Sequence, residues 1–141
     1  MINFQRRFSL GVRSALDIIN TDDFGKISQV FCSFCSGPYN TPQDYLLDFA
    51  IHHFDLIRYL GGEIKTIATF HNQIDNKGSF AVAVEFESGA IGNMQLNCQR
   101  LWGRNYDRIK ITGQNQYIVL DGLWKIDHYT CLLYTSPSPR D

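Results

Sequence analysis

Residues 44–62 read DYLLDFAIHHFDLIRYLGG, and this stretch decides the fold that the sequence predicts. At about 100° per residue, Asp48, His52 and Asp55 occupy positions i, i+4 and i+7 and leave one helix within a narrow arc. Most other positions of the stretch are apolar, which is typical of a helix that is mostly buried. Buried carboxylates and imidazoles are costly unless they are paired or used in chemistry. The stretch therefore predicts an ion-pair network or part of a functional site.

The residues at both ends of this stretch set the expected limits of the helix. Thr41 is the predicted N-cap, with Pro42 in the first turn and Asp44 three residues after the cap, close to a capping box. Gly61 and Gly62 are expected to stop the helix.

Three shorter elements are expected before this helix. Residues 1–8 predict a short strand, and Ser9 predicts the N-cap of a helix whose apolar residues recur at helical spacing. Residues 26–36, rich in β-branched and aromatic side chains, predict a strand that ends in a Gly/Pro loop.

After Gly62 the periodicity changes from helical to an alternation of period two, which predicts strands for the rest of the domain. The expected strands cover residues 64–72, 79–87, 90–100, 108–112 and 116–120. Consecutive hairpins give an open, mostly antiparallel sheet, and the two helices are available to cover one face. The predicted fold class is α+β, with one domain over residues 1–124.

The end of the chain departs from this pattern. Residues 125–141 show no clear period and predict an irregular tail. Residues 131–141, CLLYTSPSPRD, resemble the conceptual translation of a transposon-end sequencing adapter, so we expect a scar that carries no function.

Composition narrows the function classes. The chain has 141 residues, 44% of them hydrophobic, a net charge of -1 and four cysteines. Without a dense Lys/Arg block, neither nucleic acid nor an anionic membrane surface is an expected partner. The sequence contains no apolar run long enough for a membrane span and shows no signal peptide, so we expect a cytoplasmic protein with reduced thiols.

Asp48 and His52 form the strongest candidate for chemistry. A histidine titrates near neutral pH and can take a proton from an alcohol, while a carboxylate one turn away can orient the ring or bind a substrate hydroxyl. The alternative is a structural helix in which Asp55 pairs with Arg58 and His52 hydrogen-bonds inside the core. Spacing alone leaves both interpretations open.

Arginines and a loop with aromatic side chains give weaker candidates for substrate binding. Arg6 and Arg7 would bind a phosphate or carboxylate, or form a structural ion pair. Arg104 and Tyr106, beside Trp102 in the expected loop after residue 100, would wall a pocket for a polar substrate.

Metal and nucleotide sites have little support in the sequence. Cys32 and Cys35 would need His52 and His53 to complete a zinc site, yet residues three apart on a strand point to opposite faces. We therefore expect no metal. No GxGxxG or P-loop occurs, so we expect no cofactor-binding residues in this chain.

The chain resembles the C-terminal substrate domain of the Gfo/Idh/MocA oxidoreductases, in particular inositol-dehydrogenase-like members. The Asp-x-x-x-His-x-x-Asp pattern of that family matches Asp48, His52 and Asp55, although Ala50 replaces a common glycine and His53 a frequent aspartate. Four further stretches look like family landmarks in the right order, and the resemblance covers about residues 1–124. They are FQRRF (4–8), FGKI (24–27), FESGAIGN (86–93) and ITGQNQYIVLDG (111–122).

The resemblance implies an oxidoreductase that moves a hydride between a sugar or polyol carbon and NAD or NADP. His52 would be the general acid/base and Asp48 would orient it or bind a hydroxyl, whereas Asp55 and Arg58 would be structural. It also implies that the cofactor domain and a catalytic lysine belong upstream of Met1, that the fragment alone is inactive, and that homo-oligomers form through the open sheet face. The rival hypothesis is a non-enzymatic oligomerisation or ligand-binding module.

Overall fold

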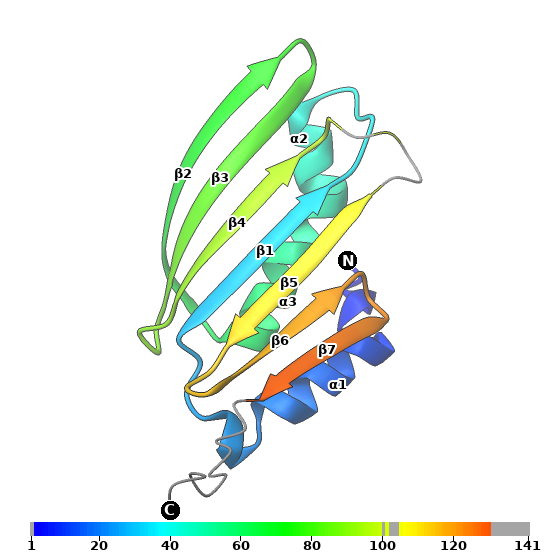
Figure 1. Cartoon of the computed structure of the whole chain (residues 1–141). Helices are drawn as coiled ribbons and strands as arrows, with labels where there is room; N and C mark the ends of the chain where they lie inside the picture. Colours follow the sequence, from blue (N-terminus) through cyan, green and yellow to red (C-terminus); the bar gives the residue numbers. More distant parts are fainter. Residues whose placement is uncertain (1, 100, 102–104, 131–141) are drawn as a thin grey trace, which may run out of the picture.

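The computed structural model describes residues 2–99, 101 and 105–130, and these form a seven-stranded sheet with helices on one face (Figure 1). The α+β class predicted from the sequence is confirmed. The strands are β1 (Gln29–Cys35), β2 (Ile64–Ile74), β3 (Lys77–Phe86), β4 (Ile91–Asn97), β5 (Tyr106–Thr112), β6 (Gln116–Asp121) and β7 (Lys125–Thr130). The helices are α1 (Leu10–Ile19), α2 (Pro42–Tyr45) and α3 (Ile51–Gly61), with 3-10 turns at Gln5–Phe8 and Asp22–Phe24.

The sheet has the order β2-β3-β4-β1-β5-β6-β7, with β1 at its centre. β1 runs parallel to β4 and antiparallel to β5, while every other neighbouring pair is antiparallel. A parallel pair needs a long crossover connection, and here the chain between β1 and β4 supplies α2, α3 and the β2–β3 hairpin.

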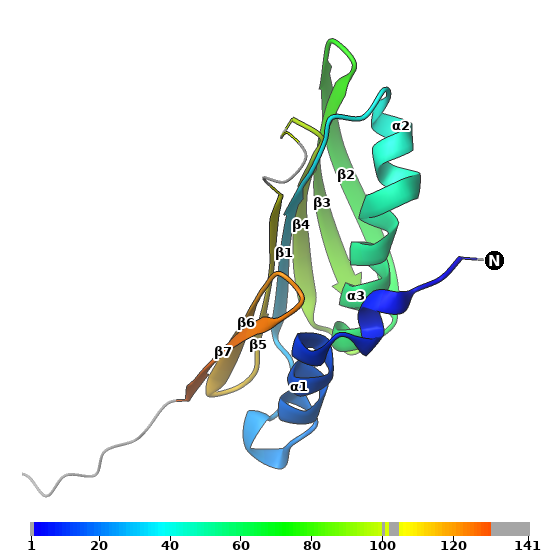
Figure 2. The same cartoon turned by 90° about the vertical axis from the view of Figure 1, so that its right-hand side faces the viewer.

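Alternation of apolar side chains decides which face of the sheet is covered. In β3, Val82, Val84 and Phe86 are buried, while Ala81, Ala83 and Glu85 between them are exposed. Figure 2 shows all three helices on one side of the sheet and none on the other. The core therefore lies between the helices and the inner sheet face, and the outer face is open.

The central helix is not a regular α-helix throughout. Thr41 Oγ1 accepts a hydrogen bond from the backbone N–H of Asp44 at 3.1 Å, as predicted for the cap, and Gly62 ends the helix at a φ of 104°. Between α2 and α3, however, the segment Leu46–Ala50 forms a π-helical turn. Such turns are wider than an α-helical turn and are frequent at functional sites. Asp48 lies in this turn, so the narrow arc expected from uniform helical spacing is only approximate.

Both ends of the described chain differ from the predictions. The strand predicted for residues 1–8 is wrong, because Gln5–Phe8 forms a 3-10 turn over the helical side, where no strand edge is available for pairing. Residues 125–130, predicted to be irregular, form β7 and pair with β6 from Gln116–Thr130 to Asp121–Lys125. β7 is an edge strand whose side chains are half-buried or exposed, so it lacks the hydrophobic alternation that marks a strand in sequence. Residues 131–141, the predicted scar, lie outside the described part.

None of the helices within the described residues is long and apolar enough to cross a bilayer.

Candidate functional site

The N-terminal 3-10 turn, Gln5–Phe8, supplies two arginines, Arg6 and Arg7. Arg7 forms an ion pair with α3. Arg7 Nε donates to Asp55 Oδ2 at 2.8 Å, and Arg7 Nη2 donates to Asp55 Oδ1. The guanidinium also lies over the Tyr59 ring at 4.6 Å. Asp55 is therefore ion-paired with Arg7 and not with Arg58, which binds Glu63 at 2.9 Å on the surface.

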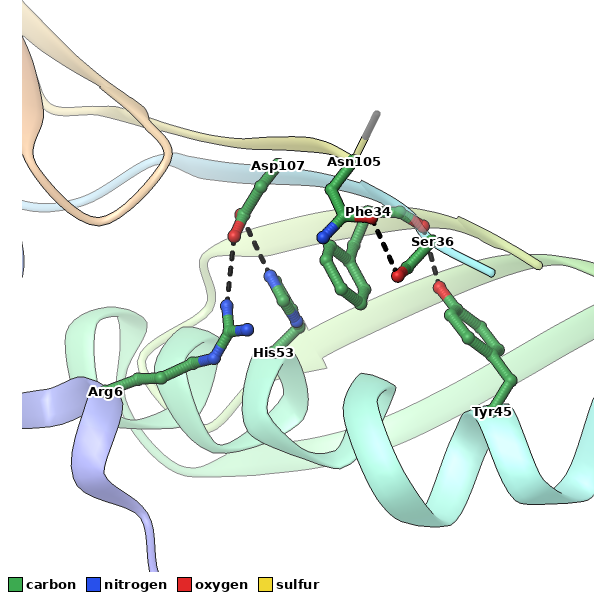
Figure 3. A network of polar contacts seen from close by, with 7 residues as sticks. All are labelled: Arg6, Phe34, Ser36, Tyr45, His53, Asn105 and Asp107. Carbon is green, nitrogen blue, oxygen red and sulfur yellow. Dashed lines mark hydrogen bonds and ion pairs between the residues drawn. The ribbon is translucent and has the colours of Figure 1, made fainter. Parts of the chain in front are cut away.

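A second ion-pair network joins the N-terminal turn, α3 and β5 (Figure 3). Asp107 accepts from Arg6 Nη1 at 3.0 Å through Oδ2, and its Oδ1 lies 2.9 Å from His53 Nε2. The His53 ring stacks on Phe34, with ring centroids 3.8 Å apart, and its side chain is fully buried. Burial alone would raise the pKa of Asp107, but the hydrogen bonds and positive charges of His53 and Arg6 outweigh it and lower that pKa. His53 and Arg6 are thus held in a structural cluster.

Two further hydrogen bonds in Figure 3 hold the end of β1, after which the chain enters the loop of residues 37–41. Tyr45 donates its hydroxyl to the carbonyl of Phe34 at 2.7 Å, and Ser36 Oγ donates to Asn105 Oδ1 at 2.9 Å. The loop that begins after Ser36 is thereby tied to the helix and to the start of β5.

His52 differs from the paired residues because its ring is half-buried and lacks an ion-pair partner among the described residues. Phe4 packs edge-on against it, with centroids 6.1 Å apart and planes at 85°. Its Nδ1 is buried and has no hydrogen-bond partner within the part of the chain that the structure describes. Burial, followed by the positive charges of Arg6 and His53, lowers the pKa of His52, and the charges of Asp55 and Asp48 oppose this only in part. His52 is therefore neutral near pH 7 and able to accept a proton.

Asp48 is exposed on the π-helical turn and lines an open groove of ≈ 460 Å³ together with Tyr39, Asn40 and Asp44. Burial raises the pKa of Tyr39, and the negative charge of Asp48 and a hydrogen bond to it raise that pKa further. In the sequence, the one signal for Tyr39 is its position in the Gly/Pro loop after β1.

The structure brings His52 and Asp48 onto neighbouring turns of one helix, close enough for the Asp48 charge to act on His52. Tyr106 is not brought to them. It pairs with Cys35 across the sheet and lines the open face with Arg108 and Lys110, because Asp107, the next residue, points toward the helices. Arg104 lies outside the described residues.

The cysteines do not converge. Cys32 faces the helices, and burial raises the pKa of its thiol. Cys35 points to the other face, where its sulfur accepts a hydrogen bond from Asn97 Nδ2 at 2.9 Å. Across residues 2–99, 101 and 105–130, no three histidine, cysteine or acidic side chains gather closely enough to hold a metal ion.

The helix N-termini do not fit a dinucleotide. At the start of α1, the Gly11 N–H donates to the Leu123 carbonyl at 3.0 Å, and a Cβ at Gly11 would lie 2.5 Å from that oxygen. The start of α2 is closed by the Thr41 side chain. A pyrophosphate needs open backbone N–H groups at a helix N-terminus, and neither helix offers them.

The charge environment of His52 leads to a prediction for this chain. Replacing Arg6 by glutamine should raise the pKa of His52, since it removes the positive charge with the larger opposing effect on protonation. An NMR titration of the His52 ring measures the change, starting from a value below the ordinary 6.5. Arg58→Gln, which removes a charge paired with exposed Glu63, is the control and should leave the pKa of His52 unchanged. An equal change in the pKa of His52 in both variants would contradict the assignment of Arg6 as a charge that lowers it.

Comparison with known proteins places these features in a family. The model of the GFO/IDH/MocA C-terminal domain matches residues 12–119. The chain belongs to this family. No curated protein sequence matches it.

Solved structures share this C-terminal fold. A dehydrogenase from Chromobacterium violaceum matches with a TM-score of 0.82 and 20% identity, over 90% of this chain and 40% of that one. Levoglucosan dehydrogenase in complex with NADH and levoglucosan matches with a TM-score of 0.78 and 19% identity, over 97% of this chain and 44% of that one. The WlbA dehydrogenase from Bordetella pertussis, in complex with NADH and UDP-GlcNAcA, matches with a TM-score of 0.70 and 18% identity, over 88% of this chain and 44% of that one. The chain thus spans less than half the length of each of these three proteins.

Proposed function

We propose that this chain is the substrate-binding half of an NAD- or NADP-dependent oxidoreductase that acts on a CH–OH group of a sugar or polyol. Family membership supports this proposal, as do similar folds in dehydrogenases bound to NADH with levoglucosan or with UDP-GlcNAcA. One observation carries the assignment to particular residues. Asp55 and His53 of the central helix are ion-paired, whereas His52 has no ion pair within the described residues and Asp48 lines an open groove.

His52 is the proposed general base for alcohol oxidation. A neutral imidazole accepts the hydroxyl proton as the alcohol becomes a carbonyl and returns it in the reverse direction. Burial and the charge of Arg6 favour this neutral form. Asp48, exposed in the groove beside Tyr39, is placed to accept a hydrogen bond from a neighbouring substrate hydroxyl.

The hydride acceptor and the catalytic lysine belong, in this proposal, to a part of the parent protein outside this chain. The closed N-termini of α1 and α2 support that division of labour. We also propose a cytoplasmic homo-oligomer that pairs through the open sheet face, where Phe70, Ile91 and Tyr129 are exposed.

A non-enzymatic oligomerisation or ligand-binding module is the second candidate. The misfit between the described helix N-termini and a dinucleotide favours it, and so does the uncovered sheet face (Figure 2). The genomic sequence upstream of Met1 discriminates the two candidates, because an in-frame dinucleotide-binding domain supports the enzyme and a genuine start site supports the module.

A fluorescence titration of the 141-residue chain with NADH tests the proposed division between two halves. We expect no saturable binding, since neither α1 nor α2 offers a cradle for the pyrophosphate. The parent protein, carrying the upstream domain, should bind NADH saturably in the same assay. Tight binding by the chain alone would refute the proposal that the cofactor site lies elsewhere.

A further inference from the structure

A second groove lies between the start of α2 and the β2–β3 hairpin and has a volume of ≈ 440 Å³. Its lining is unusual because half of it consists of carboxamide side chains, and we call it the amide groove. The carboxamides are Asn40, Gln43, Asn72, Gln73 and Asn76.

The amide groove has the chemistry of a site for neutral, hydroxyl-rich ligands. Each carboxamide both donates and accepts hydrogen bonds, as a sugar hydroxyl does. No Asp, Glu, Lys or Arg lines the groove. Within the described residues, Gln73 donates to the Asp75 carbonyl at 2.8 Å, and the carboxamides of the other four have no protein hydrogen-bond partner.

One wall of the groove is aromatic. The His71 and Phe80 rings stack with centroids 6.1 Å apart and planes at 20°. A flat apolar ring beside neutral hydrogen-bonding groups suits a pyranose, which presents C–H bonds on its faces and hydroxyls at its edge. A phosphate or carboxylate would find no lysine or arginine in this lining.

Close packing fixes the two walls relative to each other. Gly78 of the hairpin meets Pro42 of α2 so closely that a Cβ on Gly78 would lie 2.7 Å from the Pro42 Cβ. Cys98 holds Gly78 from the other side, since its N–H donates to the Gly78 carbonyl at 3.1 Å. The groove is therefore preformed rather than an accident of a free hairpin.

The amide groove adjoins the groove that contains Asp48. Asn40 lines both of them, so a ligand that contacts Asp48 can continue past Asn40 toward Gln43 and Gln73. We propose that the amide groove binds an uncharged saccharide unit, so that the substrate is a neutral glycoside or oligosaccharide longer than one sugar. This inference rests on the proposed function, because it extends the same substrate site.

NMR titration of the isotope-labelled 141-residue chain tests the inference without any enzymatic activity. The probes are two neutral disaccharides, cellobiose and maltose, compared with glucose and glucose 6-phosphate. We expect saturable shifts of the groove carboxamide signals with at least one disaccharide, and weaker binding of glucose and of its phosphate. The absence of saturable shifts with both disaccharides, or tighter binding of glucose 6-phosphate, would overturn the inference.

Variants locate the binding. The double variant Gln43→Ala/Gln73→Ala should weaken disaccharide binding roughly 10-fold, since it removes two hydrogen-bonding groups. Gln43→Ala alone leaves the hairpin intact and should show part of the loss, whereas Asn93→Ala, an exposed amide on the open sheet face, should show none. If all three variants bound the disaccharide equally tightly, the amide groove would be excluded as the disaccharide site. Such a failure is distinct from failure of the proposed function, which depends on turnover in the parent.

Discussion

Replacing His52 by alanine in the full-length parent should lower kcat/KM for oxidation of its sugar or polyol substrate by roughly 10²- to 10⁴-fold. The imidazole is the proton acceptor in the proposed reaction, and its environment keeps it neutral. His53 and Asp55 offer no replacement, since His53 is buried against Asp107 and Asp55 is bound by Arg7. The rate of NADH or NADPH formation gives the measurement.

The matched control is His128→Ala, which removes an exposed histidine on β7 that contacts Gln116. We expect its kcat/KM to stay near the wild-type value. The pH profile adds a second readout. The wild-type parent should lose activity on the acid side at a pH below 6.5, because the pKa of His52 is lowered from that value, and His52→Ala should lack this limb. An unchanged rate in His52→Ala would assign His52 a structural role.

The parts of the fold that the sequence predicted depend on local patterns. Thr41 as a cap and Gly62 as a stop use contacts within one turn, and the strands after Gly62 follow from alternation over a few residues. The π-helical turn at Leu46–Ala50 has no such local signal, because its residues also suit an ordinary α-helix. β7 was not predicted, for a different reason. An edge strand without a buried stripe looks irregular in sequence.

The division of the site residues depends on contacts between distant segments. Arg7 lies 48 residues from Asp55, and His53 lies 54 residues from Asp107, so helical spacing could not identify either pair. Spacing offered Arg58 as the partner of Asp55 because it examines only neighbouring turns. The distant partners show that Asp55 and His53 are ion-paired. A chemical role for His52 and Asp48 stays a proposal.

Replacing Asp107 by alanine should lower the free energy of unfolding by about 3 kcal/mol, the range found when one partner of a buried ion pair is removed. The carboxylate serves two partners at once, Arg6 and His53, and its side chain is 15% exposed. Its loss leaves the fully buried His53 Nε2 without an acceptor and Arg6 with an uncompensated charge. Urea unfolding of the 141-residue chain measures the change.

The control for Asp107→Ala is Glu63→Ala, which breaks the exposed pair with Arg58 and should change the unfolding free energy by less than about 1 kcal/mol. The pH dependence separates charge from packing. Because folding lowers the pKa of Asp107 below 3.8, its contribution is fully present above that value and is lost as the pH falls through the folded pKa. The difference between wild type and Asp107→Ala should therefore shrink on acidification below pH 3.8. A difference that stays constant down to the lowest pH at which the chain is folded would mean that the Asp107 charge contributes nothing and that only its volume matters.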